Sequence, residues 1–386
     1  MSRTNSSTSG SEPGGGRGRG GAKVLLFAAL WLVVFDLLIG QRFPLPREAN
    51  LPLGKLRRYF SLGQSIEGKV RTMVQPDDAH SAWIAPEGWL DSMPLTPQPT
   101  AASGPGQTLV AVYGQSFAKY MAQAIPEIDP HFEVRMMQAP SAPLNHSVAV
   151  YQRDRQRQTA QVVVIGVLAS VLPELVTMTP MTSGFEFPYT YTYPRYTLAA
   201  GQLVEHRPGI DSLPALRAAL ADRGRWNAFR AALAAHDEAF DAWTFDQGVM
   251  DWSVIGRLIR RALGQRHQRL FAARFHGREG FRNEAGLLDV AEALLAEFAR
   301  SAHQDGRLPY VILFNDLGYS DHLTRALGPR LEKHGIAYLS NDQDAPADDP
   351  SSFAIDHYRP ELYRRMAARW LADVGRRLAH PPASAP

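Results

Sequence analysis

Short apolar runs alternate with amphipathic segments along most of the chain after residue 107. Five of the apolar runs are bounded by turn-forming residues and have the length of buried β-strands. We expect these strands at residues 108–113, 132–136, 162–167, 310–314 and 336–339. Apolar positions recur at helical spacing near residues 117–125, 321–334 and 360–378. Strands that alternate with helices predict an α/β class, with a doubly wound, mostly parallel five-stranded sheet flanked by helices.

The segment between the third and fourth strands is too long for a single crossover connection. We therefore expect a helical insertion at about residues 176–307, inside a domain that spans residues 107–380. A hairpin that turns at Gly201 is expected over residues 195–206. Helices are expected near residues 213–221, 225–244, 251–264 and 284–304, with Asn283 as the cap of the last one.

Aromatic residues alternate with other residues at the start of this insertion. Such alternation is typical of a twisted strand or hairpin whose rings pack on the protein. The alternative is that flat rings stack on the faces of sugars. In that reading Tyr189, Tyr191 and Tyr193 are the candidate substrate contacts.

The N-terminal region divides into a polar tail and an apolar segment. Residues 1–22 are rich in Ser and Gly and lack the apolar surface needed to fold. Residues 23–40 are apolar apart from Lys23 and Asp36, and we expect a single-pass signal anchor there, with Asp36 near the outer interface or bound to a partner. A cleaved signal peptide is the alternative, although no small-x-small cleavage site follows.

Basic residues before the apolar segment favour a cytoplasmic N-terminus, although further basic residues follow it. The expected location is therefore the cytoplasmic membrane, with the bulk of the chain on the extracytoplasmic, periplasmic side. Residues 41–106 read as a linker and N-terminal extension, and residues 381–386 as a disordered tail.

Composition narrows the function classes. The formal net charge is +3 over 386 residues, and no basic stripe is interleaved with aromatic residues, so we expect no nucleic-acid partner. The chain has no cysteine, which excludes disulfides and thiol catalysis but fits either compartment. We expect no metal and no cofactor.

The candidate chemistry begins at Gly114-Gln115-Ser116, where a buried strand gives way to a helix. This turn places Ser116 at the carboxyl edge of the sheet, where open α/β folds bind their ligands. Gly114 relieves crowding, and the free amides of the helix are suited to hold an oxyanion. The simpler alternative is that Ser116 only caps the helix. Gly63-Gln64-Ser65 repeats the tripeptide, but no strand precedes it.

A base for this serine is available near the C-terminus, in Asp356-His357. Pro360 suits the first turn of the helix that follows, so His357 lies in the loop just before it. The positive end of a helix favours a neutral, proton-accepting imidazole. A cap or a surface position is the structural alternative for His357. Asp356 is a candidate to orient the ring, although adjacent residues on an extended backbone point apart.

In their order and context these residues resemble the SGNH (GDSL-like) hydrolase superfamily, in a divergent form with a membrane anchor. The first block of that family is matched by Gly114-Gln115-Ser116, with Gln115 in place of the usual acid, and its last block by His357. The middle blocks lack the usual glycine and asparagine oxyanion donors. Gly114, Ser170 and Asn145 are then the candidates for the oxyanion site, and Asn315-Asp316 reads as a loop cap.

The resemblance implies a membrane-anchored, extracytoplasmic serine esterase or acyl transferase. Ser116 would act as the nucleophile and His357 as the base. An O-acylated cell-envelope polysaccharide is the expected substrate, with a small ester as a simpler one. The alternative is a catalytically degenerate protein of the same fold that binds or assembles such a polysaccharide, which the missing oxyanion donors favour.

Overall fold

The computed structural model describes residues 17–45, 54–74, 84–91 and 97–380. Its centre is a five-stranded sheet in which all neighbouring strands run parallel. The strands are β1 (Thr108–Gly114), β2 (Phe132–Gln138), β3 (Val162–Leu168), β8 (Leu308–Phe314) and β9 (Ala337–Ser340), in the spatial order β2-β1-β3-β8-β9. The five predicted strands and the α/β class are confirmed, and β1 lies between the two strands that follow it in sequence.

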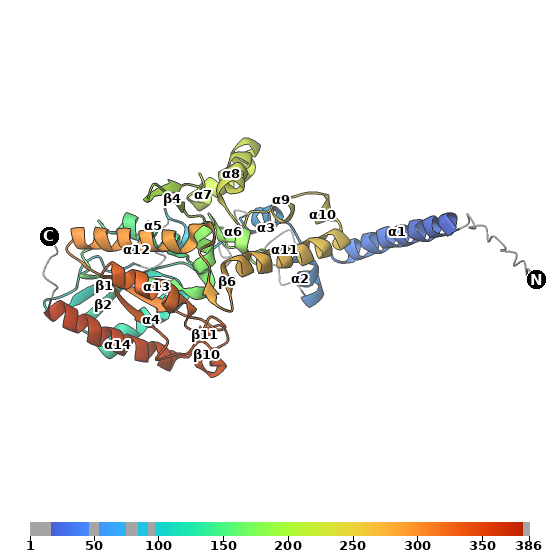
Figure 1. The fold of residues 1–386 in the computed structure, drawn as a ribbon. Coiled ribbons are helices and arrows are strands. Elements are labelled where there is room, and N and C mark those ends of the chain that lie inside the picture. The colour runs from blue at the N-terminus through green and yellow to red at the C-terminus, as the bar shows by residue number, and fades with distance from the viewer. Residues whose placement is uncertain (1–16, 46–53, 75–83, 92–96, 381–386) are drawn as a thin grey trace, which may run out of the picture.

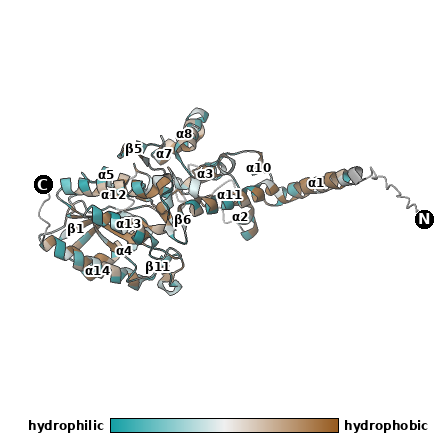
Figure 2. Cartoon of the chain, viewed as in Figure 1, coloured by the Kyte–Doolittle hydropathy of each residue, from teal (hydrophilic) through white to brown (hydrophobic). Residues whose placement is uncertain are grey.

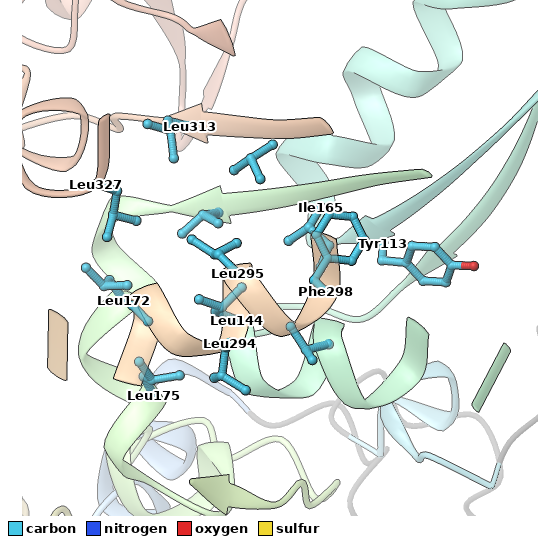
Figure 3. Close-up of a cluster of buried hydrophobic side chains, with 14 of the residues drawn as sticks. Tyr113, Leu144, Ile165, Leu172, Leu175, Leu294, Leu295, Phe298, Leu313 and Leu327 are labelled. Atoms are coloured by element: carbon cyan, nitrogen blue, oxygen red, sulfur yellow. The ribbon is translucent and has the colours of Figure 1, made fainter. Parts of the chain in front are cut away.

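Helices cover both faces of this sheet (Figure 1). One face packs against α4 (Ser116–Ile128) and α14 (Pro360–Ala379), and the other against α5 (Leu144–Asp154), α12 (Leu287–Gln304) and α13 (His322–Lys333). Side chains of β1 alternate between the two apolar clusters, because successive residues of a strand face opposite sides. Figure 3 shows the second face, where side chains of α12 pack near those of β3 and β8.

The connection between β3 and β8 contains short elements and one long helix. In chain order they are η2 (Ala169–Val176), α6 (Pro180–Ser183), β4 (Arg195–Ala199), β5 (Gln202–His206), α7 (Leu213–Ala221), α8 (Arg223–His236), α9 (Ala242–Phe245), α10 (Val249–Trp252), α11 (Val254–Phe275), β6 (His276–Gly277), β7 (Gly280–Phe281) and η3 (Glu284–Gly286). The connection ends in α12, which packs on the sheet. Helix α12 therefore acts as the crossover helix between β3 and β8.

A hairpin and several helix ends in this connection can be compared with those predicted from the sequence. The hairpin β4–β5 is confirmed, and Gly201 has the positive φ of 76° that its turn requires. The expected helix over residues 225–244 is instead two helices, because Asp237 ends α8 and its carboxylate accepts the amides of Met178 and Ala239. The side chain of Asn283 accepts the amide of Leu288 at 2.8 Å and so caps the first turn of α12.

The N-terminal region forms α1 (Arg17–Arg42), α2 (Lys55–Ser61), α3 (Ile66–Met73) and the short helix η1 (Pro86–Gly88). Within α1, the segment Gly21–Arg42 contains an 18-residue stretch with a mean hydropathy of 2.4 and no buried residue, so it is long and apolar enough to cross a membrane. Figure 2 shows this helix as a largely hydrophobic rod that projects from the domain. It begins inside the expected tail of residues 1–22. Residues 1–16 and the expected tail at 381–386 lie outside the described residues.

Candidate active site

Ser116 is the first residue of α4, directly after the carboxyl end of β1. A Cβ atom on Gly114 would lie 3.0 Å from the Cβ of Ala118 and 3.2 Å from the carbonyl oxygen of Gly166, so glycine permits this close packing. Gln115 is the N-cap residue, and its side chain makes no capping hydrogen bond. The first amides of α4 therefore have no side-chain cap and point toward the sheet edge at the half-buried Ser116.

His357 reaches Ser116 from a two-stranded hairpin, β10 (Phe353–Ala354) and β11 (His357–Tyr358), which follows the short helix η4 (Pro350–Ser352). The Nε2 atom of His357 lies 2.7 Å from the Oγ atom of Ser116. The two residues are 241 positions apart in sequence. The structure thus brings together the two side chains that the sequence proposed as nucleophile and base.

Asp356 lies on the other side of the imidazole. Its Oδ1 is 3.0 Å from Nδ1 of His357. Adjacent residues of an extended chain point apart, but Asp356 occupies the turn of the hairpin, so its carboxylate folds back toward its neighbour. The Asp356 side chain is 81% exposed, whereas that of His357 is 28% exposed. Water therefore screens the interaction between the carboxylate and the ring.

Aromatic residues of α4 hold the imidazole in place. The ring of Phe117 stacks on His357 with centroids 5.0 Å apart, and Tyr120 meets it edge-on at 5.2 Å. Sequence reasoning missed both residues. Helical spacing is the signal that identifies Tyr120, because residues 116 and 120 lie on the same face of a helix. The hydroxyl of Tyr358 donates to the carbonyl of Asn315 at 2.6 Å and so anchors the hairpin to the end of β8.

Two of the three candidate oxyanion donors have other partners. The amide of Ser170 donates to Asp316 at 3.0 Å. Burial raises the pKa of Asp316 to about 6, against the lowering effect of its hydrogen bonds with Ser170. The side-chain amide of Asn145 donates to the carbonyl of Pro194 at 2.8 Å. Gly114 supports the close packing of β1 and α4, which leaves the first amides of α4 as the available donors.

The three candidate tyrosines differ in how deeply they are buried. Tyr191 and Tyr193 are fully buried in an apolar cluster, where their hydroxyls bond the carbonyl of Pro140 and the hydroxyl of Thr177. They pack within the core and are not accessible to a substrate. Tyr189 is half-buried, and burial, with smaller contributions from Glu87 and Asp356, raises its pKa.

The other motif residues have structural roles. Ser65 is buried and caps α3 by accepting the amide of Gly68, so the second Gly-Gln-Ser tripeptide builds a helix start. The side chain of Asn315 accepts the amide of Leu323 at 2.8 Å and so holds the start of α13, as expected for a loop cap. His322 lies 2.8 Å from His276 rather than beside Ser116.

A cleft of about 1310 Å³ runs along α4 and the edge strand β2. Its lining does not include Ser116 or His357. It does include Lys119, one helical turn after Ser116, and Gln138, whose Cα partner in the sheet is Gly114. The cleft thus follows the side of α4 that faces β2, and its lining also includes Gln123 and Arg157.

Within the described part of the chain, no three His, Asp or Glu residues are placed to hold a metal ion. Comparison with known proteins gives no assignment either: no family model matches the chain, and no curated protein is significantly similar to it.

Proposed function

We propose that this chain is a serine esterase or acyl transferase of SGNH type, anchored in the cytoplasmic membrane by α1, with its α/β domain on the extracytoplasmic side. The observation that carries the proposal is the 2.7 Å separation between Ser116 Oγ and His357 Nε2 at the carboxyl edge of the sheet. A serine and a histidine at this distance form the basic unit of nucleophilic acyl transfer.

In the proposed reaction His357 Nε2 takes the proton of Ser116 as Oγ bonds to the acyl carbon. The carbonyl oxygen becomes an oxyanion, and the first amides of α4 supply hydrogen bonds and a positive helix end to it. His357 then gives the proton to the leaving alcohol as the ester bond breaks. Water releases the acyl group in an esterase, whereas a hydroxyl of an acceptor releases it in a transferase.

The proposed substrate is an O-acyl group on a cell-envelope polysaccharide. Three features support this choice: the resemblance to the SGNH superfamily, the apolar helix α1, and the cleft along α4 and β2. A long cleft accommodates an extended chain, and Lys119, Gln123 and Gln138 offer polar groups to sugar hydroxyls along it. Tyr189 is the remaining aromatic candidate for a sugar contact.

Labelling the full chain in detergent micelles with a fluorophosphonate probe tests the nucleophile. We expect labelling of the natural chain, with loss of labelling in Ser116→Ala and His357→Ala. Ser65→Ala is the matched control, because it removes the serine of the second tripeptide and should leave labelling intact. Each site variant should abolish turnover of p-nitrophenyl acetate, and the double variant should cost little more. Full activity in either single variant would refute the proposal.

A second candidate function is a binding or assembly protein that retains the fold without turnover. The specific observation in its favour is that Ser170 and Asn145 donate to protein partners instead of to an oxyanion site. Loss of one oxyanion donor typically costs about a hundredfold to a thousandfold in rate. Binding of acylated polysaccharide without labelling at Ser116 would favour this second function.

A further inference from the structure

Helix α10 exposes two large apolar side chains beside the point where α1 leaves the domain. Val249 is 84% exposed and Trp252 is 81% exposed, which is more than any large apolar residue of α1. Figure 1 shows α10 next to the junction of α1 and α11, and both helices contact α11. An exposed tryptophan beside a membrane-length helix is typical of the membrane–water interface.

Helix α1 is firmly joined to the domain at this junction. The carboxylate of Asp36 accepts the amide of Ile255 at 2.8 Å and so helps to cap α11. One turn later, a Cβ on Gly40 would lie 3.9 Å from Val254. The rings of Phe43 and Phe60 then meet at 5.3 Å. The depth of α1 in a bilayer therefore sets the depth of α10 and of the first turn of α11.

The length of α1 places this junction inside the apolar layer. From Ala22 to Phe35 the helix offers roughly 14 residues before the first acid, which is about 21 Å at 1.5 Å per residue. A bilayer core is about 30 Å thick, so the apolar layer extends past Asp36. Helix Gly21–Arg42 has 22 residues, or about 33 Å, which matches that thickness. Leu37 and Leu38 are also exposed, as lipid contact requires.

The next residues toward the domain are basic. Arg42 ends α1, and α2 carries Lys55, Arg57 and Arg58 with no acidic residue. Anionic phospholipid headgroups attract such a group of positive charges. From α1 to α2 the surface of the protein thus changes from apolar to basic. A bilayer changes in the same order, from its hydrocarbon core to its headgroup layer.

We propose that α10 and the first turn of α11 enter the outer part of a phospholipid bilayer beside α1, with Val249 and Trp252 in contact with lipid. Asp36 tolerates this depth because its carboxylate is held by the α11 amide at the positive end of that helix. The anchor thus has two parts, and the domain has a fixed orientation on the membrane. This inference rests on the proposed membrane insertion of α1 and not on the acyl-transfer chemistry.

Helix α11 then acts as a spacer. It has 22 residues, about 33 Å, and in the view of Figure 1 it continues the direction of α1. At its far end His276 contacts His322, at the start of α13 beyond the carboxyl end of β8. Helix α11 therefore separates the β8 end of the sheet from the bilayer by up to its own length.

The absence of cysteine makes a direct test possible. We would place single cysteines in the full chain as Val249→Cys, Trp252→Cys, Leu30→Cys and Ile355→Cys, attach a nitroxide and reconstitute each variant into vesicles of phosphatidylethanolamine and phosphatidylglycerol. Collision rates with oxygen, which concentrates in lipid, and with a water-soluble nickel chelate report depth. Leu30 of α1 is the lipid reference. Ile355, an apolar residue that is 96% exposed on the site hairpin, is the water reference.

We expect positions 249 and 252 to favour oxygen as position 30 does, with position 355 favouring nickel. Nickel accessibility at 249 and 252, with position 30 still in lipid, would overturn the inference while leaving α1 inserted. Protection from both reagents would also overturn it and indicate a protein contact. Nickel accessibility at position 30 would refute the insertion of α1 itself. Turnover of p-nitrophenyl acetate by the same samples reports separately on the proposed reaction.

Discussion

Replacing Asp356 by asparagine tests how much the acidic partner contributes to the candidate Ser-His pair. The carboxylate lies 3.0 Å from His357 Nδ1, but 81% of its side chain is exposed. Exposed ion pairs contribute about 0.2–1 kcal/mol. Because about 1.4 kcal/mol corresponds to a tenfold change in rate, we expect Asp356→Asn to lower kcat/KM by about fivefold at most. By comparison, replacing the buried aspartate of a serine protease triad lowers kcat by about 10⁴-fold.

The assay is hydrolysis of p-nitrophenyl acetate by the full chain in detergent micelles, at low and at high salt. The small effect of Asp356→Asn should shrink further at high salt, because salt screens exposed charges. Glu361→Gln is the matched control, since it removes an exposed carboxylate from the first turn of α14, the helix that follows the hairpin. A loss of a thousandfold or more would refute this reasoning and would mean that the hairpin closes over Asp356 when substrate binds.

Three further changes test buried positions, two of them beside the site and one in α3. Gly166→Ala should destabilise the fold by about 1–3 kcal/mol, because the new Cβ would lie 2.6 Å from that of Ala118; urea unfolding measures this loss. Burial lowers the pKa of Lys69 to about 7, so the folded amine is neutral above pH 7, whereas the unfolded amine stays protonated up to its ordinary pKa of 10.5. Between pH 7 and pH 10.5 the free energy of unfolding should therefore rise by up to about 1.4 kcal/mol per pH unit. Lys69→Met should abolish this rise, which urea unfolding at several pH values measures. Both side-chain polar atoms of Gln115 are buried without a partner among the described residues, so Gln115→Met should stabilise the chain by about 1 kcal/mol in the urea assay; lost turnover without added stability would instead place this amide in the reaction.

The site was predictable where a local pattern carries the information. A buried strand that ends at Gly114 and an amphipathic helix that follows it put Ser116 at the sheet edge whatever the rest of the chain does. The same local reasoning separated Ser65 from Ser116, since no strand precedes Ser65, and the structure shows Ser65 as a helix cap. Proline at the start of α14 likewise placed His357 in the preceding loop.

Contacts between distant segments were not predictable in this way. Helix α5 was not among the expected elements, because its buried first turn is polar. Asn145 and His146 donate to the carbonyls of Pro194 and Gly88, which no local pattern indicates. The break after α8 depends on Asp237 meeting the amide of Met178. The alternating aromatic residues favoured packing on the protein but left a sugar site as the alternative, and the burial of Tyr191 and Tyr193 excludes those two as sugar contacts.

The sequence by itself therefore determined the five strands and their order along the chain, the α/β class, the apolar span of α1 and the two residues proposed as nucleophile and base. These follow from the spacing of apolar residues and from turn residues, which act over a few positions. The tertiary structure decided that Ser116 and His357 meet, that Asp356 turns back toward the ring, and that Asp36 caps α11. Each of these depends on which residues the packed sheet, its hairpin and its helices bring within hydrogen-bond distance, and that is set by the burial of the whole core rather than by any short segment of the chain.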